Sequence, residues 1–328
     1  MIAQCCVQHT KCGPLQAPRL PTRVIDVHER ESATVHLHIS DPDGEFADYL
    51  TLSYCWGGEQ PIQTLRRNIQ NLRNNISLVE LPQTLQDAVQ TTRLLGYRYL
   101  WVDVLCIVQD DPDDKSREIA MMAETYHNST VTIVAPNSKT VNEGYLTQRK
   151  QPPFFRMPVI LPDGEVGEVG IGHPCQWAHF SWELMPLSKK AWTFQESLLA
   201  RRIIYYGPYE VLYCCQTLGF IRLLPSYIQY GDNEIASLSD ICCSKDKLEC
   251  WSEIVRQYTL RHFTFPNDRP YAIVGIASAL EEAWAQKYVF GAWSDRFLEV
   301  LTWFNVAGVP FHSSLQKSDR APSWSGYQ

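Results

Sequence analysis

The chain has 328 residues, of which 45% are hydrophobic and 20% are charged. This composition is typical of a globular protein with enough apolar side chains for a substantial core, and the length fits one large domain over residues 1–328. Lys and Arg number 29, Asp and Glu number 36, and the formal net charge is −7. A net acidic chain lacks the basic face that nucleic acid or an anionic membrane requires, so neither is expected as a partner.

Cysteine is abundant, with 11 residues that include the adjacent pairs Cys5-Cys6, Cys214-Cys215 and Cys242-Cys243. An odd number of cysteines with adjacent pairs does not resemble a disulfide framework in a chain of this length. The first residues lack the basic and apolar regions of a signal peptide, and no apolar run approaches the ~18 residues of a membrane helix. We therefore expect a cytoplasmic protein with reduced thiols.

The lead-in over residues 1–24 contains Cys6, His9 and Cys12, which are residue types that bind zinc. No second pair of ligands follows at the spacing usual for such sites. The sequence therefore favours a turn with partly buried thiols, and we expect no metal.

Residues 25–145 alternate between strand and helix patterns. Strands are predicted over 34–39, 49–54, 99–102 and 130–135, and helices over 85–95 and 113–127. Thr84 is the expected N-cap of the first helix. This order of elements predicts an α/β core with a mainly parallel sheet flanked by helices.

The pattern changes after residue 145. Residues 146–215 form an expected insertion with short strands over 151–172, a loop and helix over 187–199, and a β-hairpin of 202–206 with 210–215. Residues 216–328 are predicted to be mostly helical, with helices over 248–262, 271–287 and 293–304.

The segment RYLWVDVLCIVQDD, residues 98–111, is a predicted buried strand that ends at a carboxylate. Ligands of open α/β sheets lie beyond the carboxyl ends of strands, which makes Asp103, Cys106 and Gln109 candidate site residues. Asp103 either binds hydroxyl groups of a ligand or caps the turn. Cys106 is a candidate nucleophile, although Asp103 raises rather than lowers its pKa and no His is near in sequence. Gln109 either donates to a substrate or ties the loop to the backbone.

A second strand end holds Tyr54, Trp56 and Gly57, which we take as candidate substrate-binding residues. Gly57 and Gly58 allow close approach of the backbone. There is no P-loop and no GxGxxG motif here, so support for a phosphate cradle is weak.

These landmarks occur together in one known family. The blocks are LPTRVIDV (20–27), LSYCWGG (52–58), the region 68–89, RYLWVDVLCIVQDD (98–111), EIAMMAETYHNSTVTIVA (118–135), KKAWTFQESLLARRIIYY (189–206), NDRPYAIVGIA (267–277) and RAPSWSGYQ (320–328). Through them the chain resembles the fungal heterokaryon incompatibility (HET) domain over nearly its whole length. The resemblance implies an effector of non-self recognition and programmed cell death, with an upstream incompatibility or NLR-type sensor as partner and a capacity for self-association.

The HET domain is similar in outline to the TIR domain, which implies a TIR-like or flavodoxin-like core. Several TIR domains hydrolyse NAD with a catalytic Glu in the pattern Trp-Cys-x-x-Glu. Here Trp192 and Glu196 have the same spacing, and Thr193 stands in place of the Cys. The resemblance implies Glu196 as the catalytic residue, with Trp192 and Gln195 beside the substrate. NAD is then a substrate, and no bound cofactor is expected.

Cleavage of the nicotinamide–ribose bond suits a site with few catalytic groups. The leaving group is neutral, so no general acid is required, and one carboxylate can stabilise an oxocarbenium-like ribose and orient water. Trp56 or Trp192 can stack on the nicotinamide ring.

Several alternatives stay open. Glu196 can instead pair with Arg201 or Arg202, in which case Glu118 is the reserve candidate for the catalytic carboxylate. At the level of function, the alternatives are a non-enzymatic signalling module that assembles through its surface and a HET-like enzyme recruited to small-molecule biosynthesis.

Overall fold

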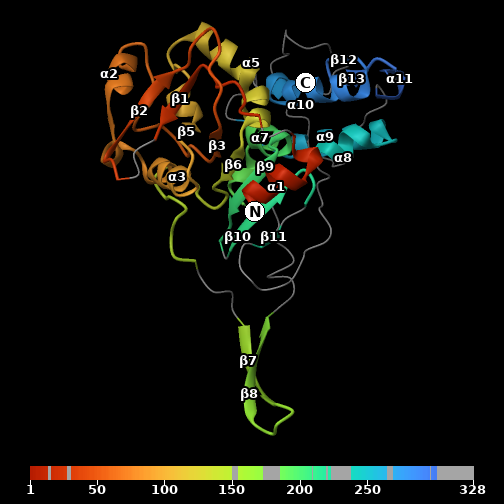
Figure 1. Cartoon of the computed structure of the whole chain (residues 1–328). Coiled ribbons are helices and arrows are strands. Elements are labelled where there is room, and N and C mark those ends of the chain that lie inside the picture. Colours follow the sequence, from red (N-terminus) through yellow and green to blue (C-terminus); the bar gives the residue numbers. More distant parts are fainter. Residues whose placement is uncertain are drawn as a thin grey trace.

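The computed structural model describes residues 1–13, 16–27, 31–149, 154–172, 185–208, 210–218, 221–222, 238–263, 269–295 and 297–300 (Figure 1). Its main feature is a nine-stranded sheet of order β11-β10-β9-β6-β3-β5-β1-β2-β4. The strands are β1 (Arg23–Asp26), β2 (Thr34–Ile39), β3 (Tyr49–Ser53), β4 (Ile76–Ser77), β5 (Tyr99–Trp101), β6 (Val131–Val134), β9 (Arg202–Tyr206), β10 (Val211–Cys215) and β11 (Ile221–Arg222).

The sheet is mixed, so the expectation of a mainly parallel sheet is wrong. Only the central strands β9, β6, β3 and β5 pair in parallel, and the outer pairs on both sides are antiparallel. The reason is the length of the connections. Parallel neighbours need a long crossover, whereas only a few residues separate β1 from β2 and β9 from β10, and such short connections permit only antiparallel pairing.

Helices pack on this sheet and on one another. The longer ones are α3 (Gln83–Leu94), α5 (Pro112–Asn128), α7 (Trp192–Leu199), α9 (Lys247–Thr259) and α10 (Arg269–Trp284). The shorter ones are α1 (Ile2–Gln8), η1 (Thr10–Cys12), α2 (Ile69–Asn74), η2 (Leu78–Glu80), α4 (Asp103–Cys106), η4 (Leu187–Lys189), α8 (Leu238–Cys243) and α11 (Phe297–Val300). None of the described helices combines the length and the apolar character that crossing a membrane requires.

Local signals explain where the two helices of the core begin. The Asp111 carboxylate accepts hydrogen bonds from the backbone N–H groups of Asp113 and Asp114, and Pro112 occupies the first turn, so α5 starts close to the predicted residue. The predicted cap of α3 is wrong. The N-cap is Pro82, and the Thr84 hydroxyl oxygen lies inside the helix, where it accepts from the Gly144 N–H at 3.2 Å.

A second apolar core lies beneath α7 and α10 and is built around Trp251, Trp284 and Trp293. Here α10 approaches its neighbours closely at Gly275. A Cβ atom at this position would lie 2.6 Å from the Cβ of Ala123 on α5 and 2.7 Å from the side-chain amide of Gln195 on α7. The three helices are thereby held against one another.

The insertion contains a two-stranded hairpin, β7 (Phe154–Ile160) and β8 (Val166–Gly172), which Figure 1 shows extended away from the body of the molecule. Strands β7 and β8 confirm the short strands predicted over 151–172, and β9 and β10 confirm the predicted hairpin. Helices α9 and α10 confirm the helices predicted over 248–262 and 271–287. In contrast, Trp293 belongs to a short strand pair, β12 (Tyr288–Val289) and β13 (Ala292–Trp293), rather than to a helix. Residues 301–304 of that predicted helix and the block 320–328 lie outside the described residues.

Candidate functional site

Two carboxylates meet at the carboxyl ends of the parallel strands. β3 ends at Ser53, and β5 leads directly into Asp103; the register of the two strands places these residues at the same edge of the sheet. Glu196 reaches this edge from α7, where the buried Ser53 hydroxyl donates a hydrogen bond to its carboxylate. The structure therefore brings Glu196 to the loop after β5, as a shared site requires.

Glu196 is 6% exposed, and its burial raises the pKa of the carboxyl group to about 8. The negative charge of Asp103 raises it further. Hydrogen bonds from Ser53 and Tyr126, together with the positive charge of Arg261, act in the opposite direction. At neutral pH the group is mainly protonated.

The alternative partners of Glu196 lie elsewhere. Arg202 donates to the sulfur of Cys5 and to backbone carbonyl groups, and Arg201 contacts His127 and Asn128. Neither arginine pairs with Glu196. The Glu196 carboxyl group is thus not part of an ion pair with the arginines that follow α7.

Asp103 links the two loops at this edge. One carboxylate oxygen accepts from the indole N–H of Trp56 at 2.8 Å, and the other accepts from the Val104 N–H at 2.7 Å. Burial raises the pKa of Asp103 to about 6, and these hydrogen bonds oppose the increase. Asp103 and Trp56 both keep part of their surface exposed. The buried Tyr54 hydroxyl lies beside Asp103 and makes no hydrogen bond of good geometry to the described residues.

Arg261 is a site residue that the sequence did not indicate. It follows α9, and its guanidinium lies 4.6 Å from the ring centroid of Phe194. The positive charge of Arg261 lowers the pKa of Glu196. The sequence also did not indicate Ser53 and Tyr126, whose hydroxyl groups contact Glu196. Ser53 stands at a predicted strand end next to Tyr54, which is a usable signal, whereas nothing in the local sequence connects Tyr126 or Arg261 to Glu196.

Cys106 is packed beneath the site. The side chain is fully buried, its sulfur accepts from the Val102 N–H at 3.4 Å, and burial raises the pKa of the thiol to about 12. A thiol that stays protonated and covered is a poor nucleophile, which argues against the expected role of Cys106 as a nucleophile.

Gln109 and Gly57 shape the loops. The Gln109 amide donates to the carbonyl oxygens of Asp103 and Ile107, both at 3.1 Å, and so ties its loop to the backbone. Gly57 has a φ of +70°, and a Cβ atom there would lie 2.4 Å from the Lys139 carbonyl oxygen. The close approach that Gly57 permits is therefore to residues 139–140, not to a phosphate.

The other residues of the WTFQE segment have different surroundings. The Gln195 amide lies between the Ala272 carbonyl and the Ala123 N–H, and it pairs with both when its nitrogen faces Ala272. It thus faces α5 and α10. Trp192 is half-buried between the two apolar cores. The Thr193 hydroxyl donates to carbonyl oxygens before the helix, so the residue in place of the TIR cysteine fixes the start of α7.

The reserve candidate belongs to another cluster. Glu118 is buried near Arg23, with 3.4 Å between guanidinium nitrogen and carboxylate oxygen, and Arg23 also pairs with Asp114. This network serves the packing of α5 against β1.

Comparison with known proteins finds similarity to one family over part of the chain. Residues 49–196 match the family model "Heterokaryon incompatibility protein (HET)". A stretch of 131 residues is 28% identical to "Heterokaryon incompatibility protein 6, OR allele" of Neurospora crassa and covers 37% of this chain and 19% of that protein. The chain thus spans less than a fifth of the length of this relative. No solved structure matches, so a TIR-like or flavodoxin-like core stays a prediction. The matched region contains β3, β5 and β6 and ends at Glu196, and it is over these residues that the chain is similar to the heterokaryon incompatibility (HET) family.

Proposed function

We propose that this chain acts in fungal incompatibility as an effector that hydrolyses NAD or NADP, with Glu196 as the catalytic carboxylate. The observation that supports this most directly is the buried Glu196 beside Asp103 at the carboxyl ends of parallel strands. Two carboxyl groups with raised pKa values at one sheet edge are typical of a working site rather than of a stabilising contact. The family match supports the biological setting.

The chemistry follows from the charges. The oxidised nicotinamide ring is cationic, so its arrival beside Glu196 lowers the pKa of the carboxyl group and produces the carboxylate where it is needed. As the bond to ribose breaks, its electron pair leaves with neutral nicotinamide and the positive charge moves to the sugar, which the carboxylate stabilises. The carboxylate also orients the attacking water and takes its proton as the new C–O bond forms. Asp103 accepts from the ribose hydroxyls, and Trp56, held by Asp103, offers an indole face to the ring.

The test is to incubate the purified chain with NAD and measure nicotinamide release. We expect Glu196→Gln to lower kcat/KM by roughly 100-fold or more, because the substitution removes the negative charge that stabilises the oxocarbenium-like ribose. The control is Glu124→Gln, which changes an exposed carboxylate on the neighbouring helix α5. Unchanged release by Glu196→Gln, or no release by the wild type at any protein concentration, contradicts the proposal.

The pH profile of the same reaction adds a readout that loss of folding does not reproduce. The carboxylate form is the active one, so kcat/KM of the free enzyme should rise with pH and level off above about 8. A profile that falls over this range contradicts the assignment of Glu196.

A second candidate function is a signalling module that assembles through its surface, and the β7–β8 hairpin favours it. Phe155, Ile160 and Val166 on this hairpin are 81%, 80% and 74% exposed. An isolated two-stranded hairpin is marginally stable in water, and apolar side chains on both its faces are typical of a segment that pairs with another surface.

This candidate predicts self-association through the hairpin. Phe155→Ser combined with Ile160→Ser should shift the chain from an oligomer to a monomer in light scattering, while Glu165→Gln at the hairpin turn should not. A wild type that stays monomeric at all concentrations contradicts this candidate and leaves the nicotinamide assay to decide the first.

A further inference from the structure

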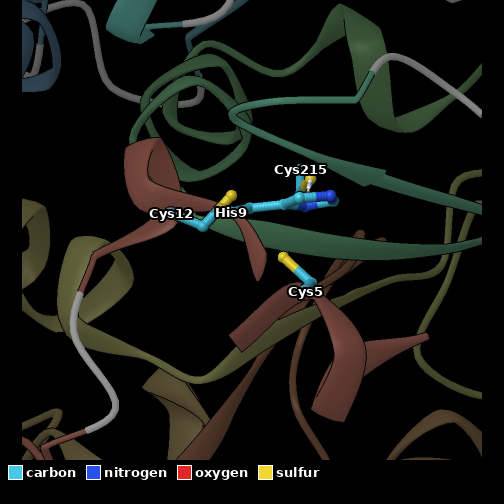
Figure 2. Close-up of side chains that lie close together, drawn as sticks. All are labelled: Cys5, His9, Cys12 and Cys215. Atoms are coloured by element: carbon cyan, nitrogen blue, oxygen red, sulfur yellow. Dashed lines mark hydrogen bonds between the residues drawn. The ribbon is translucent and has the colours of Figure 1, made fainter. Parts of the chain in front are cut away.

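The N-terminal segment and the edge of the sheet bring four metal-ligating side chains together. The Sγ atoms of Cys5, Cys12 and Cys215 and a ring nitrogen of His9 all lie within 4.8 Å of one another. Figure 2 shows the four side chains around one space, three from the N-terminal segment and Cys215 from the strand beside it. All three sulfurs are buried, and His9 is partly exposed.

Regular backbone structure builds this cluster. The His9 N–H donates to the Cys5 carbonyl oxygen at 3.0 Å at the end of α1, and the Cys12 N–H donates to the His9 carbonyl oxygen at 3.1 Å in η1. Two successive helical turns therefore bring Cys5, His9 and Cys12 to one side. Cys215 ends β10 and pairs with Arg202 on β9, so the fourth side chain is fixed by the sheet.

We propose that Cys5, His9, Cys12 and Cys215 bind one Zn²⁺ ion in a structural site. Three thiolates and one imidazole form a tetrahedral donor set that zinc prefers. Zinc–ligand bonds of about 2.0–2.3 Å place the ligand atoms of a tetrahedron roughly 3.4–3.8 Å apart. The distance from His9 Nδ1 to the Cys215 sulfur is 3.4 Å, and the remaining separations require only small side-chain adjustments.

The charge around the cluster fits a bound metal. Zn²⁺ with three thiolates and a neutral His has a net charge of −1. Arg202 is 4% exposed and donates to the Cys5 sulfur at 3.2 Å and to the Cys12 carbonyl oxygen at 3.3 Å. Within the part of the chain that the structure describes, no carboxylate pairs with Arg202. A buried guanidinium needs a counter-charge, and the zinc–thiolate centre supplies it.

A backbone N–H and a side-chain hydroxyl also face the sulfurs. The Leu218 N–H donates to the Cys215 sulfur at 3.3 Å, and the Thr217 hydroxyl lies 3.5 Å from the Cys12 sulfur. Such N–H and O–H groups stabilise thiolate ligands and hold them in place. Because protein side chains supply all four ligands, no position is left for a substrate, and the site is structural rather than catalytic.

The location supports a structural role. Arg202 begins β9, and its guanidinium donates to the Thr130 carbonyl oxygen just before β6. The cluster thus lies at the amino ends of the parallel strands, whereas Ser53 and Asp103 lie at their carboxyl ends. Zinc binding would fasten residues 5–12 to the edge of the sheet without entering the carboxylate site.

The first experiment measures metal in the full chain as purified without chelators. Elemental analysis should find one zinc per chain, and after zinc removal the chain should bind added Co²⁺ with the visible spectrum of a tetrahedral cobalt–thiolate centre. These readouts depend on the wild type alone, so they hold even where a variant fails to fold. A zinc content near zero that added Zn²⁺ does not restore, or an octahedral cobalt spectrum, overturns the proposal.

The second experiment locates the site with neighbouring cysteines as controls. Cys5→Ser, Cys12→Ser and Cys215→Ser should lower the zinc content from one toward zero or weaken Zn²⁺ affinity at least 100-fold in competition with a chromogenic chelator. Cys6→Ser and Cys214→Ser should keep one zinc, since these thiols adjoin the ligands but are not part of the set. Equal zinc in all five variants, or a disulfide between two of the proposed ligands in the freshly purified chain, overturns the proposal.

Discussion

At the scale of single residues, the proton on Glu196 connects the fold to the chemistry. The carboxyl group is buried, the positive charge of Arg261 acts on it, and its pKa is about 8. The folded chain therefore binds this proton more tightly than the unfolded chain, in which the pKa is near 4.5. In the proposed function, Glu196 is therefore held as an acid until the cationic nicotinamide ring arrives.

A pH dependence of stability follows from this difference. Between pH 4.5 and about 8 the folded state holds more protons than the unfolded state, so the free energy of unfolding falls as pH rises. We expect Glu196→Gln to remove most of this decline and to be more stable than the wild type above pH 8, by on the order of a few kcal/mol. Urea unfolding across this pH range measures it.

Asp103 contributes in the same direction only up to about pH 6, and it is present in both proteins. Its contribution therefore cancels, and the difference between the two curves should develop over the whole range from pH 4.5 to about 8. Parallel curves for wild type and Glu196→Gln would show that Glu196 is not buried as a neutral acid.

At the scale of elements, α7 holds Glu196 in place because α5 and α10 press against it. Gly275 lets α10 come within contact of Ala123 and of the Gln195 side chain, one residue before Glu196. The sequence predicted each of these helices from its own apolar pattern. It did not predict their mutual contact, because residues 123, 195 and 275 meet only through the tertiary fold.

Gly275→Ala separates two opposing effects. In a helix that tolerates a Cβ atom, the change is worth up to about 1 kcal/mol of added stability. Here the new Cβ atom would overlap the Ala123 side chain on α5, so we expect a net loss of about 1–3 kcal/mol in the free energy of unfolding and a lower Tm. Ser278→Ala, on an exposed position of the same helix, is the control and should not lower Tm. A more stable Gly275→Ala protein would show that α10 does not lie this close.

At the scale of the whole molecule, local sequence signals predicted the elements that have an apolar pattern of their own. β3, β5 and β6 with α3 and α5 were expected, because each has its own apolar pattern and turn residues. β1 was not expected. It begins and ends with Arg23 and Asp26, which are buried through ion pairs with Asp114 and Arg98 that a local pattern does not reveal.

The same distinction holds for the sites. Glu196, Asp103 and Trp56 were predicted and do come together, whereas Cys106, Gly57, Gln109 and Gln195 serve packing and loop structure. The metal cluster could not be assembled from the sequence. The local pattern pointed to Cys6, but Cys5 is the residue that faces His9 and Cys12, and the fourth ligand lies in a distant strand.

The distance between His9 and Cys215 has a consequence for synthesis. These residues are 206 positions apart in the chain. At translation rates of about 5–20 residues per second, the ribosome makes Cys215 roughly 10–40 s after His9. Until then α1 and η1 have no strand to lie against, because Arg202 and β10 do not yet exist. Residues 5–12 are thus made well before the strand that completes their cluster, and they cannot reach their final place during that interval.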